Sequence, residues 1–216
     1  MKIGIIGTGV VGQTLGTKLV ELGHSVKMGS RTATNESATA WAKAAGRGAS
    51  HGTFAEAAHH GEIVFNCTLG HVSLEALRQA GAENLAGKVL VDVSNPLDFS
   101  RGMPPTLFVA NDSSLAEQIQ AAFPKARVVK ALNTISAPVM VDPASVGRGE
   151  HTTFVCGNDA AAKKAVVEIL EKGFGWKDVL DLGDVTMARG VEGYLLLWTR
   201  LYGALGRPMF NIRVVR

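Results

Sequence analysis

The spacing of apolar positions changes several times along the chain. A short continuous apolar run predicts a buried strand over residues 2–6. Directly after it, apolar residues recur every three or four positions, as on one face of a helix: Val11, Leu15, Leu19 and Leu22. Gly23 is expected to end this helix, and the stretch from Val26 to Met28 predicts a second strand.

The alternation of strand and helix continues through the chain. Further strands are predicted over residues 63–67, 89–93, 128–132, 152–156 and near 179. Further helices are predicted over residues 38–45, 71–80, 115–123, 160–172 and 186–205. A helix is also predicted from residue 54, after the capping box that starts at Thr53, and a loop over residues 97–113. Such an order without repeats is typical of the α/β class, and it predicts a Rossmann-type doubly wound, mainly parallel sheet.

The composition of the chain changes near residue 136. Residues 136–150 are rich in Pro and Gly and are expected to cross a cleft. The 216 residues leave room for one Rossmann unit and little more. We therefore predict a Rossmann domain over residues 1–135 and a small C-terminal α/β segment over residues 136–216 that completes the cleft.

The turn after the first strand has the pattern G-x-G-x-x-G. Gly7 can make the tight turn, Gly9 lets the backbone approach a pyrophosphate, and Gly12 lets the next helix pack closely on the strand. A pyrophosphate over this turn would lie at the N-terminus of the helix, where free N–H groups and the helix dipole favour negative charge. The context of strand, turn and helix predicts a dinucleotide-binding site.

The end of the second strand indicates which dinucleotide binds. NAD-binding proteins carry an acid at this point, which accepts hydrogen bonds from a ribose 2′-hydroxyl and repels a 2′-phosphate. This chain has Ser30 and Arg31 instead, a hydroxyl and a guanidinium fork. Both suit a phosphate monoester, so the sequence predicts NADP.

Three later strand ends are expected to flank the nicotinamide. They are Cys67-Thr68-Leu69, Ser94-Asn95-Pro96 and Asn133-Thr134-Ile135-Ser136. Their side chains are small, amidic or apolar, so they can hold a flat ring and offer little proton chemistry. Hydride transfer between two aromatic rings chiefly requires alignment, whereas oxidation of an alcohol requires a general base. The sequence therefore favours transfer between rings.

Lys130 and Asn133 are the candidates for proton chemistry. They could serve as acid and orienting amide, but we expect Lys130 to pack its stem on apolar surface and keep its ammonium in solvent. His71 is a candidate cofactor contact and equally a capping or solvated histidine. His59 and His60 fall in a predicted loop without ligands at zinc spacing, so no metal is expected.

Charge and cysteine usage narrow the class of protein. The net charge is +3, but the basic residues are scattered, which argues against nucleic acid or an anionic membrane as a partner. Cys67 and Cys156 lie in predicted strands, as expected for reduced thiols of a cytoplasmic protein. We also expect no signal peptide, because the first strand begins at residue 2.

The most apolar stretch runs from Tyr194 to Leu205. It contains Arg200 and is too short to span a bilayer, so we expect a soluble protein. Because this helix is apolar nearly all round, it should be buried. Either the core of the monomer or a second subunit could cover it, and we predict a homodimer.

These residues resemble a known family, the NADPH-dependent coenzyme F420 reductases. The segment from Val129 to Ala137 is also similar to the cytosolic oxidoreductase domain of the six-transmembrane ferric reductases. The resemblance implies that Gly7, Thr8, Gly9, Val10, Val11 and Gly12 bind the pyrophosphate. It implies that Thr8, Ser30 and Arg31 hold the 2′-phosphate, and that the strand end from Asn133 to Ala137 faces the nicotinamide and a deazaflavin.

The chain departs from the archaeal pattern of this family at two places. Asn133 stands where a histidine is usual, and the basic residue often found shortly after Arg31 is missing, which implies weaker phosphate binding. No membrane segment follows, so we do not expect a haem-coupled ferric reductase. We predict a cytoplasmic enzyme that moves hydride between NADPH and a flavin-like or deazaflavin acceptor such as coenzyme F420. The alternatives are a reductase of a small carbonyl or imine, with Lys130 as acid, and a non-catalytic NADP sensor.

Overall fold

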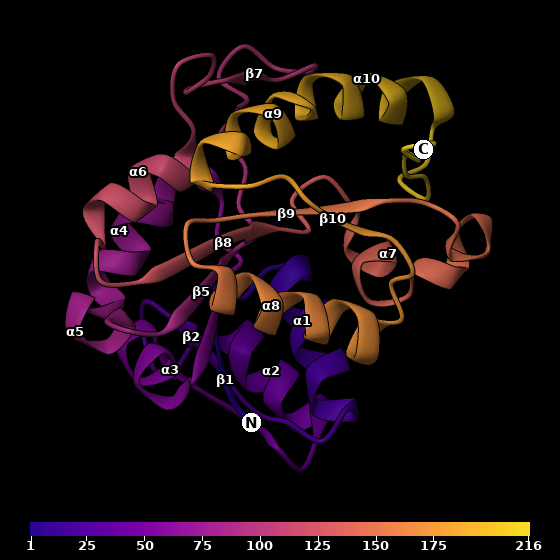
Figure 1. Ribbon diagram of the computed structural model, residues 1–216. Coiled ribbons are helices and arrows are strands. Elements are labelled where there is room, and N and C mark those ends of the chain that lie inside the picture. Colours follow the sequence, from indigo (N-terminus) through magenta and orange to yellow (C-terminus); the bar gives the residue numbers. More distant parts are fainter.

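Eight strands form one sheet at the centre of the protein, with helices on both faces (Figure 1). The computed structural model describes residues 1–216. The strands of the sheet are β1 (Lys2–Ile6), β2 (Ser25–Ser30), β3 (Ala49–Thr53), β4 (Ile63–Asn66), β5 (Val89–Asp92), β8 (Arg127–Ala131), β9 (Thr153–Cys156) and β10 (Val179–Asp181).

The strand order is β10-β9-β8-β5-β4-β1-β2-β3. The order from β3 through β1 to β8 is that of a Rossmann sheet, in which the chain winds outward from β1 in both directions. All neighbouring strands are parallel except β8 and β9, which are antiparallel. The prediction of a doubly wound, mainly parallel sheet is confirmed. The boundary near residue 136 falls between β8 and β9, two neighbours of one sheet, and the division into two parts stays a prediction.

The helices largely follow the predicted order. They are α1 (Val10–Glu21), α2 (Glu36–Ala45), α3 (Phe54–His60), α4 (Gly70–Ala80), α5 (Ala82–Leu85), α6 (Leu115–Ala122), α7 (Ala137–Val141), α8 (Ala160–Glu168), α9 (Ala188–Gly193) and α10 (Leu195–Leu205). A π-helical stretch, Ile169–Phe174, continues α8, and 3₁₀ turns lie at Pro143–Ser145, Gly147–Gly149 and Val185–Met187.

Three local predictions need correction. The predicted loop over residues 97–113 contains a small antiparallel hairpin of β6 (Leu97–Asp98) and β7 (Thr106–Leu107). His59 and His60 form the last turn of α3 and are not in a loop, because the capping box at Thr53 starts a helix long enough to include them. The predicted single C-terminal helix is divided into a 3₁₀ turn, α9 and α10.

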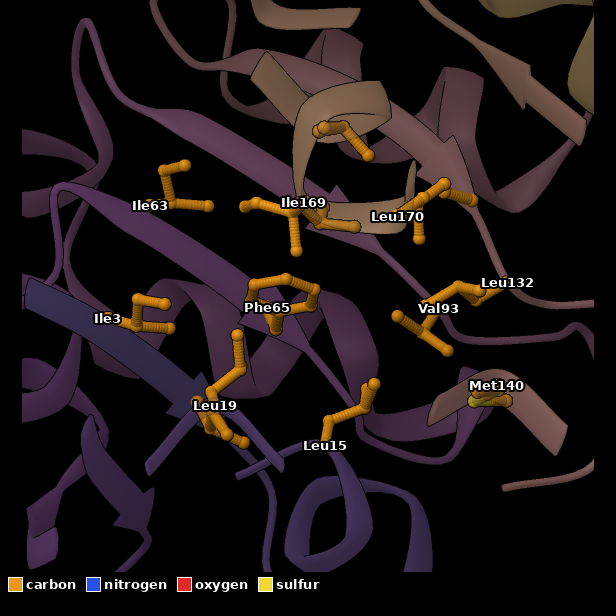
Figure 2. Close-up of a cluster of buried hydrophobic side chains, with 14 of the residues drawn as sticks. Ile3, Leu15, Leu19, Ile63, Phe65, Val93, Leu132, Met140, Ile169 and Leu170 are labelled. Carbon is orange, nitrogen blue, oxygen red and sulfur yellow. The ribbon is translucent and has the colours of Figure 1, made fainter. Parts of the chain in front are cut away.

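Two hydrophobic clusters lie on opposite faces of the sheet. Successive side chains of a strand point to opposite faces, so Ile5 belongs to one cluster and Ile6 to the other. In the larger cluster, Phe65 lies near Leu15 and Leu19 of α1 (Figure 2). Burying one such side chain stabilises the fold by about 1.5–3 kcal/mol. This packing fixes the strand ends that carry the predicted site.

Helix α10 is only partly buried within the monomer, whose core was one of the two possible covers for it. It runs along one edge of the molecule, away from the helices that cover the sheet (Figure 1). Only Leu195 and Thr199 are buried, whereas Leu197 and Leu205 are 53% and 52% exposed. Coverage of this face by a second subunit stays a prediction.

Candidate dinucleotide-binding site

The parallel strands place the predicted site residues at one edge of the sheet. β1, β2, β4, β5 and β8 run in the same direction, so the segments that follow them lie along their common carboxyl edge. The chain order reverses between β1 and β4, and ligands of open α/β sheets bind at such a switch point. The fold therefore brings together the five predicted segments, which are 7–12, 30–31, 67–69, 94–96 and 133–137.

The geometry of the glycine-rich turn agrees with its predicted use. Gly7 has φ +116° and approaches β4 so closely that a Cβ there would lie 2.8 Å from the carbonyl oxygen of Cys67. A Cβ at Gly12 would lie 2.5 Å from the carbonyl oxygen of Gly7, so the helix can pack on the turn only without a side chain there. A Cβ at Gly9 would meet nothing within 4 Å. Open space at this position fits the approach of a pyrophosphate.

The N-terminus of α1 is open to an anion. Its N-cap residue is Gly9, which offers no side-chain hydrogen bond, and the first turn contains no acidic residue. Val10, in the first turn, is 73% exposed. The first N–H groups of the helix therefore lack side-chain partners, as a pyrophosphate site requires.

Arg31 and Ser30 differ in their availability to a 2′-phosphate. Arg31 is exposed and takes part in none of the ion pairs of the protein. Ser30 is buried, and its hydroxyl donates a hydrogen bond to the carbonyl oxygen of Thr32. The guanidinium is thus free to bind a phosphate, while the Ser30 hydroxyl shapes the turn that carries it.

An amide pair joins the predicted nicotinamide-flanking segments. The Asn133 side chain donates to the Asn95 side-chain oxygen at 3.0 Å and to the Val191 carbonyl oxygen at 3.1 Å. In return, Asn95 donates to the carbonyl oxygen of Asn133 at 2.8 Å. Leu132, just before this pair, has φ +63°, a conformation that costs free energy for a bulky side chain. The chain therefore turns sharply at the end of β8, and Asn133, Thr134, Ile135 and Ala137 are buried.

Lys130 is placed differently from the prediction. Its side chain is fully buried, and its ammonium bonds Asp92 at 2.7 Å, Glu192 at 2.8 Å and the carbonyl oxygen of Ser94 at 2.6 Å. The expectation of a solvated head is wrong, because two carboxylates compensate the buried charge. Burial by itself lowers the pKa of Lys130, but Asp92 and Glu192 outweigh it and raise that pKa above its usual value.

Asp92 and Glu192 are the residues that the sequence interpretation missed. Asp92 accepts hydrogen bonds from the Asn66 side chain at 2.8 Å and the Ser94 hydroxyl at 2.7 Å. Glu192 accepts the first backbone N–H groups of α6, from Leu115 at 2.7 Å and from Ala116 at 3.1 Å. The signal for Asp92 was a charged residue inside an apolar strand run, as at position 130, whereas Glu192 lies in a helix outside these runs.

Cys67, Thr68 and His71 surround the N-terminal end of α4. The Thr68 hydroxyl bonds both the Asn66 side-chain oxygen and the Ser73 hydroxyl at 2.7 Å. Cys67 is a free thiol, and burial raises its pKa, so it stays protonated. His71 and Leu69 are exposed beside it. None of these groups forms a nucleophile paired with a base.

Two further observations concern possible metal ligands and the position of a surface groove. No group of three His, Cys, Asp or Glu side chains is close enough to hold a metal ion. A groove of about 830 Å³ lies between α1, α2 and α7 and contains none of the predicted cofactor-binding residues.

The fold and the glycine-rich turn define a class, the Rossmann-type dinucleotide-binding proteins. Residues 2–96 match the family described as NADP oxidoreductase, coenzyme F420-dependent. A solved structure from Arthrobacter sp. FB24, assigned as a candidate F420-dependent NADP reductase, is 50% identical, with a TM-score of 0.94 and full coverage of both chains. The chain therefore belongs to the F420-dependent NADP oxidoreductase family, a family of NADP-dependent enzymes.

Two curated relatives match the chain over different lengths. The F420-dependent NADP reductase of Methanocaldococcus jannaschii is 30% identical over 138 residues, which cover 63% of this chain and 60% of the relative. The metalloreductase STEAP3 of Rattus norvegicus is 36% identical over 194 residues, which cover 88% of this chain. The chain spans only 36% of that metalloreductase's length. No helix of this protein has the length and apolar character needed to cross a membrane.

More distant solved structures share the fold. An imine reductase of Bacillus cereus matches with a TM-score of 0.62 at 24% identity, and covers 94% of this chain. At this level of identity the match concerns the arrangement of strands and helices and carries no information on the reaction.

Proposed function

We propose that this protein transfers hydride between NADPH and a flavin-like or deazaflavin acceptor, with coenzyme F420 as the leading candidate. Membership of the family and the names of its relatives support the choice of acceptor. The free Arg31 guanidinium supports the choice of NADPH over NADH.

Each part of the site has a separate task in this proposal. The open turn at Gly9 and the N-terminus of α1 bind the pyrophosphate, and Arg31 binds the 2′-phosphate. The segments after β4, β5 and β8 hold the nicotinamide ring against the acceptor. Bound NADPH supplies a hydride at its nicotinamide carbon. The Asn95–Asn133 pair keeps two of these segments in register and thereby aligns the ring.

The observation that carries the proposal is the saturation of Lys130. An ammonium has three N–H donors, and all three are used by Asp92, Glu192 and the Ser94 carbonyl oxygen. The only side chain that the sequence offers as a general acid is therefore unable to reach a substrate. A reaction that needs alignment and exclusion of water fits such a site better than reduction of a carbonyl or imine.

A panel of acceptors tests the proposal. Purified protein and NADPH are mixed with coenzyme F420, FMN, FAD, a small ketone and a cyclic imine, and the nicotinamide absorbance band is followed. We expect turnover with a ring acceptor and none with the ketone or imine. Turnover of the imine alone would promote the imine reductase alternative, and tight NADPH binding with no turnover would indicate a sensor.

We further propose that the protein acts in the cytoplasm as a homodimer. Both cysteines are free, and Cys156 is buried, which supports a reducing compartment. The exposed apolar residues of α10 support a second subunit on that face, because large apolar patches on a surface mark interaction sites.

A further inference from the structure

The charged residues Asp92, Lys130 and Glu192, here called the buried triad, form one connected unit. The side chains of Asp92 and Lys130 are fully buried, and that of Glu192 is 2% exposed. One ammonium faces two carboxylates, so the triad carries one net negative charge. The N-terminus of α6 compensates part of that charge, because its backbone N–H groups donate to Glu192.

The triad joins the nicotinamide-flanking segments to distant parts of the chain. Asp92 holds the turn after β5 through the backbone N–H and hydroxyl of Ser94. It also holds the Asn66 side chain, which in turn accepts the Thr68 hydroxyl of the segment after β4. Glu192 lies in α9 and binds the N-terminus of α6, so it connects both helices to the triad. The same helix α9 accepts the Asn133 amide at Val191.

Stability alone does not account for such an arrangement. Removing two carboxylates and an ammonium from water costs several kcal/mol per ion, and apolar residues of similar volume often serve a core equally well. Charged groups also form directional hydrogen bonds, and each of these bonds fixes the position of a particular atom. In this protein the fixed atoms belong to Thr68, Ser94 and the start of α6.

We propose that the buried triad is a positioning device, which sets the orientation of the nicotinamide-flanking segments and thereby the rate of hydride transfer. This inference rests on the proposed function. Asp92, Lys130 and Glu192 act through Ser94, Thr68 and Asn133 and do not touch the cofactor. The residues proposed to bind the phosphates follow β1 and β2, and none of the triad's hydrogen bonds reaches these two strands.

The test uses Glu192→Gln and Asp92→Asn, which keep the shape of each side chain and remove its charge. The matched control is Arg189→Gln, because Arg189 binds Glu117 at 2.6 and 2.9 Å and so links the same two helices, α9 and α6, without touching the triad. Thermal unfolding establishes that each variant is folded at the assay temperature. The readouts are the NADPH dissociation constant, the fluorescence of the bound reduced nicotinamide, and the single-turnover rate with the best acceptor.

We expect both triad variants to bind NADPH within about threefold of the wild type, because their phosphate contacts are intact. The hydride-transfer rate should fall on the order of tenfold or more, since small misplacements of reacting groups can cost up to about 10²-fold. The nicotinamide emission should fall with it, and the control should match the wild type in all three readouts. Wild-type rate and emission in folded triad variants would overturn the proposal, as would equal losses in the control.

The fluorescence readout separates this inference from the proposed function. It needs NADPH and no acceptor, so it reports on ring orientation whether or not the acceptor is correct. A wild-type protein that reduces no ring acceptor would contradict the proposed function. If its nicotinamide emission still fell in both triad variants and not in the control, the positioning role would stand.

Discussion

Removal of the Lys130 ammonium should strongly destabilise the fold. In Lys130→Met the stem keeps its packing, but Asp92 and Glu192 lose their common partner while they stay buried. Breaking a buried pair in this way costs about 3–5 kcal/mol, because an uncompensated charge remains in a low dielectric. Native proteins have a free energy of unfolding of about 5–15 kcal/mol, so the loss would be a large share of the total.

The assay is urea unfolding followed by circular dichroism, with thermal unfolding as a second probe. For a protein of this size 1 kcal/mol corresponds to about 2–4 °C in Tm, so we expect a decrease of roughly 6–20 °C. Lys172→Met is the matched control, because Lys172 is 75% exposed and 3.8 Å from Glu168, and it should change stability by less than about 0.5 kcal/mol. Adding Asp92→Asn and Glu192→Gln to Lys130→Met should recover part of the loss. A Lys130→Met protein within about 1 kcal/mol of the wild type would refute this view of the triad.

Three other predictions concern the cofactor, the ring site and the assembly. NADPH should bind at least about tenfold more tightly than NADH, and Arg31→Glu should remove most of that preference, because a charged hydrogen bond contributes about 1.5–3 kcal/mol. Titration of the wild type with both nucleotides measures the preference, and equal affinities would contradict the prediction. A bulky residue at Ala137, such as Leu, should slow hydride transfer severely by displacing the buried start of α7. A variant that retains the wild-type rate would count against the placement of the rings. Light scattering should detect a dimer to which Tyr194, Trp198 and Leu201 contribute, and a 22.7 kDa particle at high concentration would rule it out.

The fold could be predicted largely from the sequence because its signals are local. Apolar runs of four to six residues mark the buried strands, and the capping box at Thr53 marks the start of α3. The hairpin of β6 and β7 was missed because two-residue strands have no periodicity to detect. The sequence left open what covers α10, because composition shows that a helix is apolar and does not show what packs against it.

The candidate site was predictable where it depends on backbone geometry. The three glycines of the turn have the close approaches or the open space that their spacing predicts. The environment of Lys130 was not predictable, because its partner Glu192 lies 62 positions away in the sequence and only the folded chain brings them together. Charges in apolar strands indicate that partners exist, but they do not identify them.

The central claim is direct hydride transfer from NADPH to a ring acceptor, and isotope transfer tests it most directly. NADPH that carries deuterium at the reactive position of the nicotinamide is mixed with the protein and oxidised coenzyme F420 in ordinary water. Direct transfer would place one deuterium on a carbon of the reduced deazaflavin, where it cannot exchange with water, and mass spectrometry of the product would detect it. The label is placed on one face of the nicotinamide and then, in a second experiment, on the other. Reduced product without deuterium in both experiments, or no reduction at all, would contradict the claim.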